Sequence, residues 1–275
     1  MNCRTFLDLI FHNRNPTEYI ELRCLGENRP KRMKFLSIEP INQQLIEKIQ
    51  ADKYNVFFGV ACRNEDYSVS SLQALWVDID FKDFSSDGII PVATTIVAKL
   101  VLSAISPSII VSSGHGIHAY WLLESPLTDV DLGKDVLKRL AKTFDGDSCH
   151  DPTRILRLPD SYNLKDKDNP ILCSVVGGNG ERYELAEIMA NVTVVPSISD
   201  NIVSLIDSGS VTGFKSRSER DFAVIKELVL QGNSYQEVEN IFQENKIGDK
   251  YREKGANGHL YLSTTYNAVS KGEKK

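Results

Sequence analysis

The sequence LWVDIDF occupies residues 75–81 and places two acidic residues within a strongly apolar, strand-like stretch. Residues two apart on a β-strand point to the same face, so Asp78 and Asp80 project together while Val77 and Ile79 face the other side. Two carboxylates this close repel each other unless a proton or a cation lies between them. Mg²⁺ and Mn²⁺ are hard cations that prefer oxygen ligands. The stretch therefore predicts a metal-binding strand, and a solvated edge strand is the simpler alternative.

A glycine-bearing turn follows in the sequence SSGHGIHAYW, residues 112–121. Gly114 and Gly116 allow a tight turn and a close approach of the backbone to a ligand. His118 begins the returning strand, from which its side chain could donate to a phosphate oxygen. A hairpin with an incidental histidine is the alternative. A zinc pair formed by His115 and His118 is weaker still, because no third nitrogen or sulfur ligand is suitably spaced.

A basic segment follows in GDSCHDPTRILRLPDSYNLK, residues 146–165. Its positive charge is carried by Arg154, Arg157 and Lys165. Arginine forks and a lysine point charge suit a triphosphate or a nucleic-acid backbone. Asp147 and Asp151 are each candidates for a third carboxylate next to the acidic pair. A solvated loop with arginine–aspartate pairs is the alternative interpretation.

The composition is that of a globular chain. Of 275 residues, 41% are hydrophobic and 25% charged, which excludes a collagen, bulk disorder and a coiled-coil rod. No apolar run approaches the roughly 18–20 residues of a membrane span, and Asp8 interrupts the first apolar stretch, so neither a membrane segment nor a signal peptide is expected. Five scattered cysteines without a C-x-x-C pair predict a reducing, cytoplasmic setting and no structural zinc.

The net charge of -5 is distributed unevenly along the chain. Residues 1–36 hold seven basic and four acidic side chains, and residues 201–275 hold eleven and ten. The middle, residues 37–200, holds 14 basic and 23 acidic side chains. A phosphate-binding protein usually has a basic surface. An acidic centre between basic ends suits a metal-dependent site.

Strand and helix patterns alternate over the first two thirds of the chain, which predicts a mixed α/β or α+β domain. The expected strands are 19–25, 33–38, 55–61, 74–81, 108–112, 117–123, 154–158 and 171–176. The expected helices are 41–49, 91–105, 129–144 and 183–190. We expect a catalytic domain at 1–195, a linker at 196–214 and a small all-α module at 215–275. In the all-α module, helices are expected at 218–231, at 234–245 with an S-x-x-E capping box at its start, and from about Ser263.

The order of the three motifs is more specific than any one of them. D-x-D, then S-G-x-G-x-H-x-Y-W, then D-x-x-R-x-x-R-x-P with a trailing N-x-K resembles the archaeo-eukaryotic primase superfamily, the primase-polymerases. The motifs span about residues 50–180. The resemblance implies a mixed-sheet catalytic domain with an RRM-like core, followed by a helical module. One departure is Asp160, which follows Leu158-Pro159 where many relatives have glycine.

The resemblance also implies a role for each motif. Asp78 and Asp80 would be the metal-binding pair, with Asp147 as third metal ligand and Asp151 in reserve. His118 would contact the phosphates of the incoming nucleotide. The remaining nucleotide-binding residues implied are Ser112, Gly114, Gly116, Arg154, Arg157 and Lys165. In the helical tail, further cations available for phosphates are Lys215, Arg217, Arg220, Lys250, Arg252 and Lys254.

The implied activity is that of a DNA-dependent primase-polymerase using two Mg²⁺ or Mn²⁺ ions and no zinc. Its partners would be NTPs or dNTPs, a single-stranded DNA template and a primer-template. A separate helicase is a further candidate partner, because the chain lacks G-x-x-x-x-G-K-[ST]. Two alternatives are a non-catalytic replication-initiation or DNA-binding protein, and a metal-dependent nucleotide phosphohydrolase, for which His150-Asp151 gives weak support.

Overall fold

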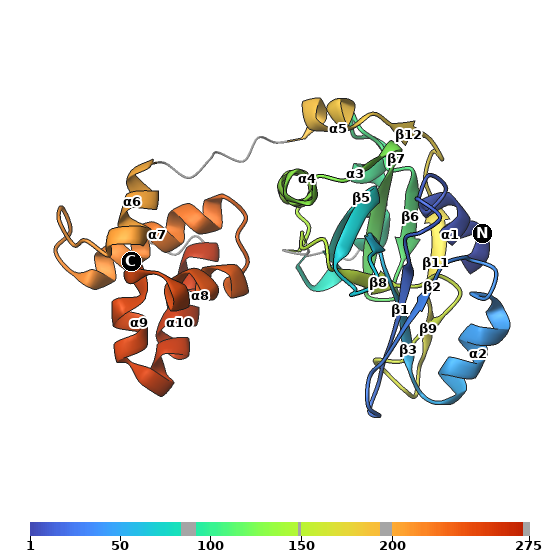
Figure 1. Cartoon of the computed structure of the whole chain (residues 1–275), viewed down its shortest axis with the longest axis horizontal. Helices are drawn as coiled ribbons and strands as arrows, with labels where there is room; N and C mark the ends of the chain where they lie inside the picture. Colours follow the sequence, from blue (N-terminus) through green and yellow to red (C-terminus); the bar gives the residue numbers. More distant parts are fainter. Residues whose placement is uncertain (84–91, 148–149, 193–199, 272–275) are drawn as a thin grey trace. The chain divides into compact units, whose positions relative to one another are not determined.

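The structure is a computed structural model that describes residues 1–83, 92–147, 150–192 and 200–271. The chain divides into two compact units, residues 1–193 and 194–275 (Figure 1). The expected helix start at Pro91, the expected domain end at residue 195 and Cys149 lie outside the described residues. The four cysteines among the described residues are buried and form no disulfide.

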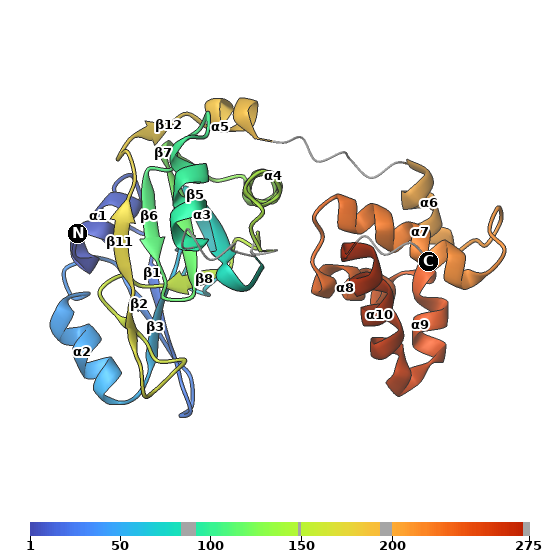
Figure 2. The same ribbon diagram turned by 180° about the vertical axis from the view of Figure 1, so that it is seen from behind.

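The first unit is built on two sheets, whose strands pair antiparallel except for β12. The smaller has the order β2-β1-β3-β8, and its strands are β1 (Ile20–Leu25), β2 (Lys31–Phe35), β3 (Asn55–Gly59) and β8 (Ile155–Arg157). The larger has the order β11-β6-β7-β5-β4, with β12 parallel to β7. Its strands are β4 (Cys62–Arg63), β5 (Val69–Asp80), β6 (Ile109–Ser112), β7 (Gly116–Leu127), β11 (Ser174–Gly177) and β12 (Arg182–Tyr183). Figure 2 shows β11, β6 and β7 side by side.

A short hairpin and several helices complete this unit. The hairpin consists of β9 (Tyr162–Asn163) and β10 (Ile171–Leu172). The helices are α1 (Cys3–Ile10), α2 (Gln43–Ala51), the 3₁₀ turn η1 (Phe81–Asp83), α3 (Val92–Val101), α4 (Val130–Phe144) and α5 (Leu185–Asn191). The α4 helix begins at Asp129, whose side chain accepts a hydrogen bond from the Leu132 N–H at 3.0 Å. The expected mixed α/β fold class is confirmed.

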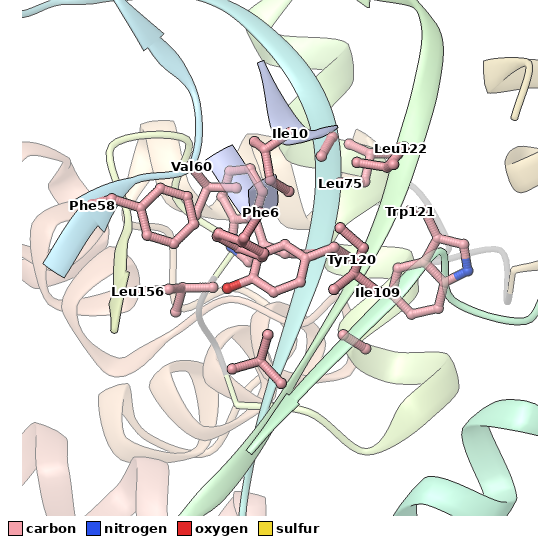
Figure 3. Packing of buried hydrophobic residues seen from close by; sticks show 14 of the residues in the cluster. Phe6, Ile10, Phe58, Val60, Leu75, Ile109, Tyr120, Trp121, Leu122 and Leu156 are labelled. Carbon is pink, nitrogen blue, oxygen red and sulfur yellow. The ribbon is translucent and has the colours of Figure 1, made fainter. Parts of the chain in front are cut away.

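The main core lies between the two sheets, where side chains of α1 fill the space (Figure 3). The Phe6 ring meets Phe58 of β3 at 5.3 Å and Tyr120 of β7 at 5.5 Å between centroids, in edge-to-face contacts. Neighbouring Trp121 points to the opposite face of β7 and stacks on Phe144 of α4 at 5.1 Å. The alternation along β7 thus places one aromatic residue in each of two apolar layers.

Some element boundaries differ from those expected. The sequence analysis assigned no helix to residues 3–10. The α3 helix ends at Val101 rather than at 105, because the Ser103 hydroxyl donates to the Leu100 carbonyl and the chain turns. The helix expected from residue 183 begins at Leu185, because Arg182 and Tyr183 pair with β7.

The second unit is helical and has its own apolar core. Its elements are α6 (Asp200–Ser208), α7 (Arg217–Leu230), α8 (Tyr235–Glu244), η2 (Lys246–Gly248), α9 (Asp249–Glu253), η3 (Gly255–Asn257) and α10 (Gly258–Ser270). The capping box at Ser234 and Glu237 is present. Helix α6 corrects the expectation of a linker over 196–214, because Leu205 and Ile206 pack into the core of this unit. The last helix begins five residues before Ser263.

Part of the tail's positive charge is used inside the second unit. Arg220 is fully buried and pairs with Asp221 and Asp249, both at 2.7 Å. Arg252 donates to the carbonyls of Phe242, Gln243 and Asn245 at the end of α8. These two arginines therefore stabilise the bundle, which corrects their expected availability for phosphates. No helix among the described residues is long and apolar enough to span a bilayer.

Candidate active site

A pocket of about 200 Å³ lies in the first unit, lined by residues of both sheets. The larger sheet contributes residues of β5 and β7, and the smaller contributes Phe57 of β3 and residues of β8. Most of the site residues predicted from the sequence line this pocket. They are Asp78, Asp80, Gly116, His118, Asp147, Arg154, Arg157 and Lys165. Three separate motifs are therefore brought together by the pairing of β5 with β7 and by the approach of β8.

The acidic pair lies at the end of β5 in register with β7. Asp78 is opposite His118, and Asp80 is opposite Gly116. The Asp78 carboxylate lies 3.6 Å from His118 Nε2 and 3.4 Å from Arg154 Nη2. Its side chain is only 19% exposed. At Asp78 and Asp80 the strand β5 pairs with β7, whereas β4 pairs with β5 only at Val69 and Ser71. The low exposure and the ion contacts of Asp78, rather than the position of the strand in the sheet, argue against a solvated face.

Asp80 is held by a lysine two residues further on. Lys82 Nζ lies 2.8 Å from Asp80 Oδ2, and this hydrogen bond lowers the pKa of the Asp80 carboxyl. Asp80 is therefore ionised at neutral pH. Both carboxylates of the pair thus have a cationic partner from the chain itself.

The two candidates for a third carboxylate lie in different places in the structure. The Asp147 N–H donates to the carbonyl of Asp78 at 2.7 Å, which places Asp147 beside β5 and in the pocket lining. The Asp151 carboxylate accepts a hydrogen bond from the Thr153 N–H at 2.8 Å and is not part of the lining. His150 is buried while Asp151 is exposed, so the two do not form the paired site that a phosphohydrolase would use.

His118 is buried between the acidic pair and the core. Burial lowers the pKa of its imidazole, partly offset by the attraction of Asp78. Its Nδ1 lies 3.3 Å from the Tyr120 hydroxyl, and burial raises the pKa of Tyr120 well above its usual value. The hydroxyl therefore keeps its proton, and it can donate that proton to Nδ1 or accept one from it. In the first arrangement the proton of the neutral imidazole is on Nε2, and His118 then offers an N–H donor on the pocket side.

The glycine turn serves close packing as much as ligand access. A Cβ atom on Gly116 would lie 2.6 Å from the Ile79 carbonyl oxygen, so only glycine allows β7 to approach β5 here. Gly114 has a φ of 98°, a conformation that favours glycine. Ser112 and Gly114, which were expected among the nucleotide-binding residues, are not in the pocket lining. Ser113, which lies between them in the sequence, is in the lining.

The basic residues that line the pocket come from three places: Arg154 directly precedes β8, Arg157 ends β8, and Lys165 follows in the next segment. Arg157 Nη1 donates to Asn55 Oδ1 at 2.6 Å, and its guanidinium lies 4.7 Å from the centroid of the Phe57 ring. The turn that leads to Lys165 contains Asp160, whose φ of 64° lies in the left-handed region. Aspartate tolerates this conformation, which explains how it occupies a position where many primase-polymerases have glycine.

No family model and no curated protein matches the chain. Among solved structures, the AEP domain of the cyanophage S-2L primase-polymerase matches with a TM-score of 0.53 and 19% identity, over 69% of this chain and 95% of that domain. The chain has a primase-like fold. Primase RepB′ matches with a TM-score of 0.46 and 15% identity, over 96% of this chain and 93% of that one. The RepB′ catalytic domain in complex with initiator DNA has the same TM-score and identity, over 67% and 92%.

The pocket lining includes the type of ligand that Mg²⁺ and Mn²⁺ prefer. Among the described residues, no three His, Cys, Asp or Glu side chains lie close enough together to form a metal site. Asp78, Asp80 and Asp147 nevertheless line one pocket, and carboxylate oxygens are the ligands that hard cations take. The pairing of Asp78 with Arg154 and of Asp80 with Lys82 shows that both carboxylates attract positive charge.

Two residues that support the pocket were given no role in the sequence analysis, although Asn163 belongs to the N-x-K motif. Fully buried Arg63 donates to Glu21 Oε2 at 2.7 Å and to the carbonyls of Pro152 and Thr153 at 3.2 and 3.0 Å. It thereby holds the segment just before Arg154. Asn163 donates to the Ser113 carbonyl at 2.9 Å and so ties β9 to the glycine turn. Arg63 lies outside any motif, so no sequence signal pointed to it.

We expect Gly116→Ala to destabilise the first unit by about 1–3 kcal/mol, the usual cost of overpacking. The added methyl group would have to displace the backbone of β5 beside Asp80. Urea denaturation followed by tryptophan fluorescence measures this loss. Gly177→Ala is the matched control, because its Cβ would meet nothing closer than 3.9 Å. Equal stability of the two variants would contradict the close approach of β5 and β7.

Proposed function

We propose that the chain is a DNA-dependent primase-polymerase, which transfers nucleotides from NTPs or dNTPs to a growing strand on a single-stranded DNA template. One observation carries the proposal. Three carboxylates, two histidines and three cationic side chains line a single pocket in a primase-like fold. The phosphohydrolase alternative lacks this support, because Asp151 lies outside that pocket.

The formal charges of the pocket suit a nucleoside triphosphate. Its permanent charges come from three carboxylates and from three cations, so they cancel. Asp78, Asp80 and Asp147 would hold two divalent cations, and the lining would then carry the positive charge that a triphosphate requires. This also explains why an acidic central region is compatible with a polyanionic substrate.

The chain's own side chains have distinct tasks in this proposal. The neutral His118 donates its Nε2 proton to a phosphate oxygen, and Arg154, Arg157 and Lys165 bind the remaining phosphate charge. Bound Mg²⁺ or Mn²⁺ would activate the attacking hydroxyl and neutralise the leaving group. A hydroxyl oxygen attacks the α-phosphorus, the bond to pyrophosphate breaks, and the hydroxyl proton passes to solvent.

A gel assay on single-stranded DNA tests this function. The wild-type chain is incubated with Mg²⁺ or Mn²⁺, with and without a primer, and with NTPs or dNTPs. We expect extended or newly made strands, one pyrophosphate released for each nucleotide added, and no product in EDTA. Release of inorganic phosphate without products would indicate a phosphohydrolase. DNA binding without any synthesis would indicate a non-catalytic binding protein.

A further inference from the structure

The outer face of the smaller sheet presents a row of basic and aromatic residues that begins in the pocket. Arg157 is opposite Phe57, Phe57 is opposite Arg23, and Arg23 is opposite Arg32 in the registers of β8, β3, β1 and β2. Figure 1 shows these four strands as neighbours. Residues directly opposite each other in an antiparallel sheet share a face. We call Arg157, Phe57, Arg23 and Arg32 the arginine row.

Burial confirms which face carries the arginine row. The alternate residues of the same strands are buried in the core between the sheets: Leu22, Cys24, Val56, Phe58 and Leu156. Because side chains alternate along a strand, the row lies on the opposite face, away from that core. The side chains of Arg23 and Arg32 are 33% and 39% exposed. At a spacing of about 4.8 Å per strand, the row extends about 14 Å from β8 to the edge of the sheet.

The edge strand β2 adds further positive charge and aromatic rings. The Arg32 guanidinium lies 3.8 Å from the centroid of the Tyr67 ring, and Lys34 Nζ lies 4.5 Å from that of Tyr19. Glu21 contacts Arg32 at 2.5 Å, the fully buried Arg63 at 2.7 Å and Arg23 at 3.5 Å. Besides the hydrogen bonds from Ser68, the charge of Lys34 helps to lower the pKa of the Asp66 carboxyl, so Asp66 also lies near this face. The three arginines of the row and Lys34 outnumber these two carboxylates, which leaves an excess of positive charge.

We infer that the arginine row and Lys34 form a track that binds single-stranded DNA and leads the template into the pocket. This inference rests on the proposed function for the identity of the strand. A basic groove combined with aromatic faces is the chemistry that binds unpaired nucleic acid, since the cations bind phosphates and every base can stack on a ring. Phe57 lines the pocket where the row begins, and the Arg157 guanidinium lies over its ring, so a template base that stacks there would also contact Arg157.

The test is equilibrium binding of fluorescent oligo(dT) to the full chain, without nucleotide and in EDTA. The variants are Arg32→Gln, Lys34→Gln and the double variant, none of which lies in the pocket. Each lost phosphate contact lowers the slope of log affinity against log salt concentration by about 0.7. At about 0.1 M salt this corresponds to an affinity about 5-fold weaker for each single variant and about 25-fold weaker for the double variant. The Lys34→Gln variant leaves the contacts of Glu21 unchanged, so its result does not depend on that buried carboxylate.

Lys31→Gln is the matched control, because Lys31 is on the same strand but on the other face and lies 3.4 Å from Asp52. We expect it to bind oligo(dT) like the wild type. We also expect Phe57→Leu to weaken oligo(dT) binding by about 5-fold or more through lost stacking, while duplex binding is unchanged. The proposed track would be contradicted if the Arg32→Gln/Lys34→Gln variant bound oligo(dT) like the wild type, or if Lys31→Gln lost as much affinity as Lys34→Gln.

The outcomes separate this inference from the proposed function. If the wild type synthesises DNA and the Arg32→Gln/Lys34→Gln variant keeps full affinity for oligo(dT), the track is contradicted and the proposed polymerase function stands. If the Arg32→Gln/Lys34→Gln variant loses affinity but the wild type synthesises nothing, the DNA-binding face is supported and the proposed polymerase function is contradicted. Asp78→Asn/Asp80→Asn should not weaken oligo(dT) binding, because neither residue belongs to the arginine row.

Discussion

Replacing Asp78 and Asp80 together with asparagine is expected to lower nucleotide incorporation by about 10³-fold or more. Asparagine keeps the size and one oxygen of each side chain but removes the negative charge that would hold divalent cations. The fold should persist, because the two side chains are 19% and 29% exposed at the end of β5 and are not part of the apolar core. Incorporation of labelled nucleotide on primed single-stranded DNA measures the effect.

Asp145→Asn provides the matched control for charge removal. Asp145 is exposed, lies two residues before Asp147 and pairs with Lys99 at 2.5 Å. Asparagine also tolerates the left-handed conformation of this position, where φ is 54°. We expect this variant to retain full activity. A comparison of Asp147→Asn with Asp151→Asn then identifies the third ligand, and only the first should lose incorporation. Loss in Asp151→Asn alone would contradict the assignment of Asp147.

The second large effect expected is on stability. Arg63→Met should lower the free energy of unfolding of the first unit by about 3 kcal/mol, the lower end of the cost of breaking a buried ion pair. It removes the fully buried partner of Glu21 and the two hydrogen bonds to the carbonyls of Pro152 and Thr153. Arg32 and Arg23 still contact Glu21, so its carboxylate keeps part of its compensation.

Tryptophan fluorescence during urea denaturation reports this loss for the first unit alone. The chain has two tryptophans, and both Trp76 and Trp121 are buried in the first unit. Exposed Arg29→Met is the control and should unfold like the wild type. Adding Glu21→Gln to Arg63→Met should recover part of the lost stability, since it removes the uncompensated charge. A loss below about 1 kcal/mol, typical of a surface pair, would contradict the structural role of Arg63.

The fold class and most of the pocket could be predicted because local patterns specify them. The D-x-D spacing fixes the shared face of Asp78 and Asp80, and the turn before Gly116 joins β6 and β7 into a hairpin. The register that places His118 opposite Asp78 belongs to the pairing of β5 with β7, which joins segments about forty positions apart and is not set by that turn. The register of a hairpin follows from its turn and its apolar alternation, both of which are visible in the sequence. Arg157 lies beside the residues of β3 because β8 pairs with β3. The order of the motifs indicated that the basic segment belongs to the same site, but no local pattern predicted this strand pairing.

The features that could not be predicted depend on contacts between distant segments. Helix α1 owes its place to Phe6, which packs against residues more than fifty positions away. Helix α6 was not predicted because its segment is rich in serine. Leu205 and Ile206 can be recognised as core residues only in the packed second unit. Arg63 is a partner of Glu21 and of residues 152–153, so its function exists only in the folded chain.

Pyrophosphate release per incorporated nucleotide, measured on single-stranded DNA with Mn²⁺, tests most directly whether this pocket transfers nucleotides. The wild type and Asp145→Asn should release one pyrophosphate for each nucleotide added, and Asp78→Asn/Asp80→Asn should give neither pyrophosphate nor product while its tryptophan fluorescence shows an intact fold. Synthesis by the double variant in the same range as the wild type would contradict the proposed function of the pocket.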